Sequence, residues 1–124
     1  IMEDLEENFL VLNGDLLTNI NFAKLFDTHV RQKAAATIAT FQRTVNIDFG
    51  VLEVDQNSEL TDYSEKPSFD YKVSMGINVF QKSCIEPLIE PGKYLDIPDL
   101  MMKLKEKNQK VFCYQEDCEW LDIG

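Results

Sequence analysis

Two carboxylates stand near opposite ends of the chain, each directly after an apolar run. Asp15 follows the run that begins at Phe9, and Asp122 follows Trp120 and Leu121. A buried strand that ends in an acidic residue places a carboxylate at the rim of a sheet, where open α/β folds bind ligands. Two carboxylates together with substrate phosphates suit Mg²⁺. The pair therefore predicts a Mg²⁺ site and phosphate chemistry, on the condition that the two aspartates meet in the fold.

A second charged group lies in the middle of the chain, in the segment Glu65-Lys66-Pro67. Lysine is a good point-charge donor to a phosphate, and a glutamate beside it can accept hydrogen bonds from sugar hydroxyls. Each group also has a plain structural interpretation. Asp15 can cap the helix that follows it, and Asp122 can end a buried strand at a turn. The Glu65-Lys66 pair can be a solvated pair at the end of a hairpin, so the residues alone leave both interpretations open.

The elements that must position these groups follow an α/β pattern in which strands outnumber helices. Apolar spacing at i, i+3, i+4 and i+8 predicts a helix over 22–32, and continuous or β-branched runs predict strands. Gly76 inside a strand indicates a bulge, or a close approach by ligand or backbone. We expect strands at 9–12, 34–41, 49–54, 60–64, 72–80 and 110–114, helices at 22–32, 83–89 and 96–108, and the tail of a helix at 2–7.

Composition disfavours several classes of protein. The 124 residues carry a net charge of −10, which repels nucleic-acid phosphates, and no apolar stretch is long enough to cross a bilayer. Three scattered cysteines favour reduced thiols in a cytoplasmic protein. The single histidine, His29, disfavours a zinc site or a catalytic triad. Because the chain starts at Ile1 rather than Met, we expect a fragment of a longer protein.

Five short motifs follow one another along the chain: Asn13-Gly14-Asp15, Phe49-Gly50-Val51, Glu65-Lys66-Pro67, Met75-Gly76-Ile77 and Trp120-Leu121-Asp122-Ile123-Gly124. In this order they resemble the sugar-phosphate nucleotidyltransferases, also called nucleotide-sugar pyrophosphorylases, over almost the whole chain. The resemblance implies a three-layer α/β sandwich with a mixed, Rossmann-like sheet. It also implies a Mg²⁺-dependent reaction between a nucleoside triphosphate and a sugar 1-phosphate that releases pyrophosphate.

The resemblance gives roles to six residues. The catalytic residues are Asp15, Lys66 and Asp122, with Asp15 and Asp122 as the metal ligands and Lys66 on the sugar's phosphate. The residues that bind the sugar substrate are Gly50, Glu65, Lys66 and Gly76, with Glu65 accepting hydrogen bonds from the sugar hydroxyls.

One departure from the family is the lack of its N-terminal Gly-rich loop, which holds the triphosphate. We therefore expect residues 1–124 to be a single fragment of the catalytic domain that lacks this half and is inactive alone. An exposed strand edge and apolar face then predict a homo-oligomer. The alternatives are a non-catalytic regulatory or assembly relative of the same fold, and a metal-dependent glycosyltransferase, which Asn13-Gly14-Asp15 disfavours for lack of an Asp-x-Asp pair. The segment 93–98 resembles relatives that activate mannose- or heptose-type sugars, which favours a guanylyltransferase.

Overall fold

The computed structural model describes residues 6–93 and 96–122, with the backbone alone at residue 122. The chain divides into two compact units. The core unit comprises Ile1–Phe41 and Ser74–Gly124, and the hairpin unit comprises Gln42–Val73.

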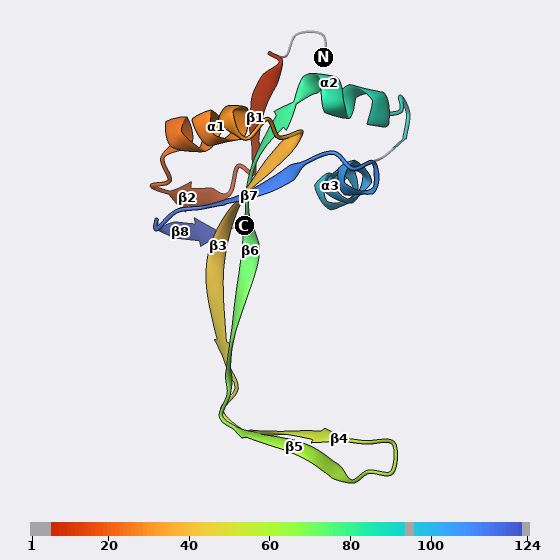
Figure 1. Ribbon diagram of the computed structural model, residues 1–124. Coiled ribbons are helices and arrows are strands. Elements are labelled where there is room, and N and C mark those ends of the chain that lie inside the picture. The colour runs from red at the N-terminus through yellow and green to blue at the C-terminus, as the bar shows by residue number, and fades with distance from the viewer. Residues whose placement is uncertain (1–5, 94–95, 123–124) are drawn as a thin grey trace. The chain divides into compact units, whose positions relative to one another are not determined.

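A four-stranded sheet with the order β1-β6-β3-β7 forms the centre of the core unit (Figure 1). Strand β1 is antiparallel to β6, whereas β3 is parallel to β7, so the sheet is mixed as expected. The outer parts of β3 and β6, residues 42–46 and 68–73, belong to the hairpin unit. The four strands are β1 (Asn8–Leu12), β3 (Ala36–Asn46), β6 (Ser68–Gln81) and β7 (Val111–Gln115).

Helices cover both faces of this sheet, which confirms the three-layer α/β sandwich. Figure 1 shows α1 (Phe22–Arg31) and α3 (Ile97–Glu106) on opposite sides of the strands. Asn21 caps α1 by accepting a hydrogen bond from the backbone N–H of Lys24, and Asp96 caps α3 in the same way. Between β6 and α3 the chain forms α2 (Lys82–Ile85) and a 3-10 turn, η2 (Glu86–Leu88).

Each face of the sheet has its own hydrophobic cluster. Alternation along β6 sends Ile77 and Val79 towards Leu25 of α1, and Phe80 towards Leu104 of α3. These side chains are almost completely buried, so the two clusters hold the helices against the sheet.

Two smaller ladders complete the described structure. A two-stranded ribbon in the core unit pairs β2 (Leu16–Thr18) with β8 (Trp120–Asp122) in antiparallel orientation. The hairpin unit contains β4 (Gly50–Val54) paired with β5 (Leu60–Glu65).

The structure departs from the sequence-based expectations at four places. The β2 strand was not expected, and Asp122 lies in the small ribbon rather than at the end of a strand of the main sheet. Strand β1, which was expected to be a buried strand, has one strand partner among the described residues and is only partly buried. The helix expected over 83–89 divides at Pro87, which has no N–H to continue the α pattern. Of the helix tail expected at 2–7, residues 2–5 lie outside the described part, and residues 6 and 7 are not helical.

Candidate active site

The turn that carries Asp15 is anchored to the neighbouring strand. After β1 ends, the backbone N–H of Asn13 donates to the carbonyl of Gly76 at 3.0 Å. Gly76 has a φ of +79°, and a Cβ at this position would lie 2.5 Å from Nδ2 of Asn13. The prediction for Gly76 was a bulge or a close approach by ligand or backbone, whereas the group that lies against its Cα is the Asn13 side chain. The backbone angle favours glycine, and a Cβ would force the Asn13 amide to shift. The carboxylate of Asp15 is exposed beyond this anchored turn.

The β2–β8 ribbon brings the two distant aspartate positions together. Its register pairs Leu16 with Asp122 and Thr18 with Trp120. Asp15 is therefore the chain neighbour of Leu16, the residue directly opposite Asp122. Paired strands lie about 4.8 Å apart, so the backbones at positions 15 and 122 are close. The side chain of Asp122 lies outside the described part of the structure. The backbone therefore meets the condition that the two positions converge, while their role as metal ligands stays a prediction.

The chemistry of this pair fits a hard divalent cation. Carboxylate oxygens are the protein ligands that Mg²⁺ takes, and it commonly needs only one or two of them when phosphates supply the rest. Among the described residues, no three His, Cys, Asp or Glu side chains gather into a metal-binding group.

The base of the hairpin unit gathers the residues expected to bind the sugar phosphate. The register of β4 and β5 sets Gly50 directly opposite Glu65. The next residue, Lys66, has a φ of +45°, an uncommon angle for a residue with a side chain. The backbone N–H of Lys66 donates to the carbonyl of Phe49 at 3.3 Å. This turn presents the exposed Lys66 and Glu65 together at one end of the hairpin.

Tyr63 is a neighbour of this group that the sequence reasoning missed. A Cβ at Gly50 would lie 2.5 Å from the hydroxyl oxygen of Tyr63, so the tyrosine ring extends across the glycine. Tyr63 and Glu65 are two residues apart on β5 and therefore share a face. That spacing is a signal available in the sequence, and it could have placed Tyr63 beside Gly50 once the hairpin was recognised.

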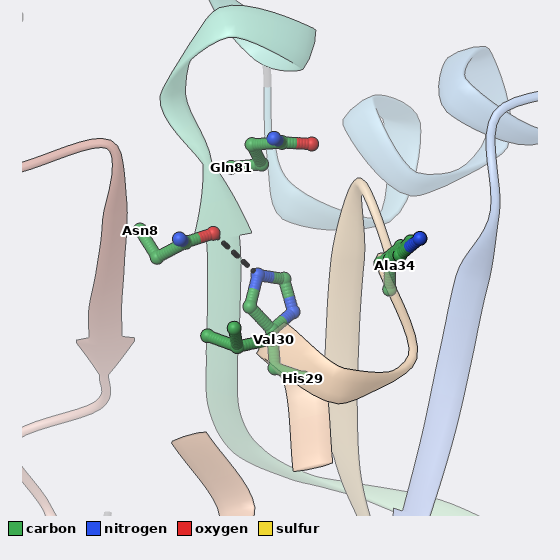
Figure 2. Close-up of a pocket in the computed structure, with 6 residues that line it drawn as sticks. Asn8, His29, Val30, Ala34 and Gln81 are labelled. Atoms are coloured by element: carbon green, nitrogen blue, oxygen red, sulfur yellow. Dashed lines mark hydrogen bonds between the residues drawn. The ribbon is translucent and has the colours of Figure 1, made fainter. Parts of the chain in front are cut away.

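The single histidine is held in structural contacts. Nδ1 of His29 lies 2.7 Å from the Thr37 hydroxyl. Nε2 lies 3.0 Å from the Asn8 side-chain oxygen, the contact that Figure 2 marks with a dashed line. Since the Asn8 oxygen can only accept, Nε2 carries the proton and Nδ1 accepts from Thr37. The ring is fully buried beside a cavity of about 270 Å³, and this burial lowers the pKa of His29. These contacts join α1 to β1 and β3 through His29.

The six predicted site residues fall into the two units. Asp15, Gly76 and Asp122 belong to the core unit, and Gly50, Glu65 and Lys66 belong to the hairpin unit. Within each unit the structure brings the predicted residues into one neighbourhood, through the ribbon and through the hairpin base respectively. Their meeting in a single pocket stays a prediction.

Comparison with known proteins decides the family. The sequence model of the family described as Nucleotidyl transferase matches residues 1–124. The chain belongs to this family. A glucose-1-phosphate adenylyltransferase of Bacillus licheniformis is 28% identical to this nucleotidyl transferase chain over 128 residues, covering 95% of the chain and 34% of the relative. A UTP–glucose-1-phosphate uridylyltransferase of Synechocystis is 29% identical over 126 residues, covering 96% of the chain and 32% of the relative. The nucleotidyl transferase chain thus spans about a third of the length of these curated relatives.

Solved structures of similar fold support the architecture. The crystal structure of HddC from Yersinia pseudotuberculosis matches 98% of the nucleotidyl transferase chain and 52% of its own chain, with a TM-score of 0.64 and 17% identity. At this identity the likeness shows the fold alone, and it agrees with the mixed α/β sandwich described above. None of the helices in the described part of the chain is long and apolar enough to cross a membrane.

Proposed function

We propose that this chain forms the sugar- and metal-binding part of a Mg²⁺-dependent sugar-1-phosphate nucleotidyltransferase. The observation that carries the proposal is the ribbon register, which sets Asp122 opposite the residue that follows Asp15 in a chain that matches the nucleotidyl transferase family from end to end. That register brings together the two positions whose carboxylates the resemblance assigns to the metal.

The proposed reaction couples a sugar 1-phosphate to a nucleoside triphosphate. A phosphate oxygen of the sugar attacks the α-phosphorus, the bond from that phosphorus to the bridging oxygen of the β-phosphate breaks, and pyrophosphate leaves. Lys66 neutralises the phosphate of the sugar, and Glu65 accepts hydrogen bonds from its hydroxyls. Asp15 and Asp122 hold Mg²⁺, which when bound supplies charge neutralisation for the phosphates. No covalent nucleophile is needed, which agrees with a histidine already occupied by Thr37 and Asn8.

We propose glucose 1-phosphate as the first candidate for the sugar substrate, with adenine or uracil as the base. The two curated relatives above carry glucose 1-phosphate in their names, one as an adenylyltransferase and one as a uridylyltransferase. The second candidate is a mannose- or heptose-type guanylyltransferase. It rests on the segment 93–98, of which residues 94 and 95 lie outside the described part. One of the HddC crystal structures of similar fold contains GMP-PN, which gives this candidate its specific support.

We further propose a cytoplasmic setting, a homo-oligomer, and no nucleic-acid or membrane partner. The cysteines Cys84, Cys113 and Cys118 are free thiols, which suits a reducing compartment. The net charge of −10 disfavours nucleic acid, because phosphates are repelled.

Binding to the chain tests the proposed metal site. Mn²⁺ serves as the probe, and electron paramagnetic resonance counts the free ion during a titration of the 124-residue chain. We expect Asp15→Asn to weaken Mn²⁺ binding at least tenfold. The matched control is Asp62→Asn, which removes an exposed carboxylate from β5 and should leave the affinity unchanged. Equal affinities for the Asp15→Asn variant and the unmodified chain would remove the metal site from the proposal.

Calorimetric titration with glucose 1-phosphate tests the sugar side. We expect Lys66→Ala to weaken binding at least tenfold, whereas Lys72→Ala, an exposed lysine on β6, serves as the control and should bind as before. Mannose 1-phosphate in the same experiment ranks the two sugar candidates. Because no Gly-rich phosphate loop occurs in these 124 residues, we expect no pyrophosphate release by the chain alone. Robust turnover would contradict that expectation.

A further inference from the structure

The β2–β8 ribbon is too short to fix its own register. It pairs only three residues on each strand, and isolated two-stranded ladders are marginally stable in water. A shift of one residue would carry every side chain of β8 to the opposite face. The position of Asp122 relative to Asp15 therefore depends on contacts outside the three pairs.

Such contacts lie at the end of the ribbon away from the two aspartates. The Thr18 hydroxyl donates to the backbone carbonyl of Glu119 at 2.5 Å, and the backbone N–H of Asn19 donates to the same carbonyl at 3.3 Å. The Asn19 side-chain oxygen accepts from the backbone N–H of Glu119 at 2.6 Å. The Thr18 oxygen also accepts from the N–H of Ile20 at 3.2 Å, which fixes the hydroxyl's orientation. Both backbone polar groups of Glu119 are thus held by Thr18 and Asn19.

The loop before β8 is held at its other end as well. The Glu116 carboxylate accepts from the backbone N–H of Asn21 at 3.2 Å and from the Tyr114 hydroxyl. Trp120, directly after Glu119, packs against Phe41 with ring centroids 5.4 Å apart. The loop before β8 is therefore held by hydrogen bonds at both ends, at Glu116 and at Glu119. Glu119 is the end that lies next to the ribbon.

We propose that Thr18 and Asn19 are positioning residues that set the register of β8 and so the placement of Asp122 beside Asp15 for a divalent cation. This inference rests on the proposed metal site. Neither residue touches the cation in this proposal, and their side chains act through the backbone of Glu119. The geometry favours a register role because the bonds are made to the backbone of the residue immediately before β8 begins, where a slip would start.

Two readouts on the 124-residue chain test the proposal. The first is the cross-strand nuclear Overhauser effect between Leu17 and Leu121, which the register pairs. The second is Mn²⁺ affinity by electron paramagnetic resonance. We expect Thr18→Val, which keeps the shape and removes the hydroxyl, to lose the Leu17–Leu121 signal and to bind Mn²⁺ at least tenfold more weakly. Thr18→Ser keeps the donor and should restore both.

Controls separate register from general stability. Thr28→Val removes a hydroxyl that donates to the carbonyl of Lys24 at 2.7 Å within α1, and it should change neither readout. Asn19→Ala is the second variant, used where Thr18→Val does not fold, and should act in the same direction. A Thr18→Val chain with the register and the Mn²⁺ affinity of the unmodified chain would overturn the proposal. If Mn²⁺ binding proves independent of Asp15, the proposed metal site fails, and the Leu17–Leu121 signal alone decides whether Thr18 sets the register.

Discussion

The two groups of predicted site residues are held in place by different kinds of contact. In the core unit, the corner near Asp15 depends on residues far away in the sequence, since Thr18 and Glu119 are 101 residues apart. In the hairpin unit, Gly50 and Glu65 face each other through a local turn and a single ladder. The core corner also rests on a buried sheet, whereas most side chains of β4 and β5 are exposed.

This difference separates two ways of building a binding site. Long-range anchoring should fix the proposed metal-binding corner and should make it sensitive to changes in the core. Local pairing should leave the proposed sugar-binding residues tolerant of substitution, with the placement of the hairpin side chains set by the turn at Lys66 and its positive φ. Stability measurements on matched substitutions in the two units can break or sharpen this contrast.

Truncation of a buried leucine should give the largest contrast. Leu25 is 0% exposed between α1 and the sheet, so Leu25→Ala should cost about 2–5 kcal/mol of unfolding free energy through lost burial and a cavity. Leu52 in the hairpin unit is 55% exposed, and Leu52→Ala should cost less than about 1 kcal/mol. Urea unfolding followed by far-ultraviolet circular dichroism measures both. Similar losses for the two variants would show that the hairpin is as tightly packed as the core.

The two site glycines give the next contrast. Gly76→Ala forces a methyl group against the Asn13 amide and places alanine at a φ of +79°, so we expect a loss of about 2 kcal/mol or more. Gly50→Ala meets the hydroxyl oxygen and two ring carbons of Tyr63 at 2.5–3.0 Å, but Tyr63 is 56% exposed and its ring can swing into solvent. We expect that loss to stay below about 1 kcal/mol.

Double substitutions separate the causes at these glycines. When Asn13→Ala is combined with Gly76→Ala, the part of the stability loss that comes from the clash should be recovered. The part that comes from the backbone angle should remain. Tyr63→Ala combined with Gly50→Ala should recover nearly all of the smaller loss. Full recovery at Gly76 would mean that the positive φ carries no penalty, contrary to the expectation for a residue with a Cβ.

Acid should destabilise the core unit through its buried histidine. Burial lowers the pKa of His29, so at pH values below the ordinary value of about 6.5 the unfolded chain holds more protons there than the folded chain. The contribution of His29 to the free energy of unfolding is therefore fully present above that value. It is lost as the pH falls towards the pKa of His29 in the folded chain. Unfolding free energies from urea titrations between pH 7.5 and 5.5 should show this slope, and His29→Gln should flatten it. Because the sequence has one histidine, an unchanged slope in that variant would rule out His29 as its source.

Local patterns were enough to predict much of the fold, and long-range contacts explain most of what they missed. The apolar stripe of α1 is a signal within a few residues, and so is the β4–β5 hairpin; both were found. The β2–β8 ribbon gave no such signal, since strands of three residues have no detectable periodicity. Its partners lie about a hundred residues apart, and only tertiary structure brings them together.

The candidate site follows the same rule. The residue types of Asp15, Glu65 and Lys66 indicated phosphate and sugar chemistry, but the partners that hold them were not visible in the sequence. Gly76 signalled a close approach without revealing that the approaching group is the Asn13 side chain. Thr18 and Asn19 have no catalytic or ligand-binding role in the proposal, so no sequence motif could have predicted their contacts with Glu119.

The smallest expected effect concerns association of copies through the hairpin unit. Its register places Leu52 opposite Tyr63, with Val54 and Leu60 at the end of the same ladder, and all four side chains are more than half exposed. A two-stranded ladder with one exposed apolar face is marginal in water by itself, so covering it with a second copy is favourable. We expect reversible dimers at high protein concentration in sedimentation velocity.

A charge on this face should prevent that association, and a charge on the opposite face should not. Leu52→Lys puts an ammonium group into the apolar face and should shift the chain to monomer. Glu53→Lys is the matched control, because Glu53 pairs with Asp62 and so lies on the other face of the ladder, where the added lysine faces an acid. An unmodified chain that stays a compact monomer at high concentration would contradict the expected homo-oligomer. Dimers that persist in Leu52→Lys would instead move the interface to the open edge of β1, whose outer backbone groups have no strand partner among the described residues.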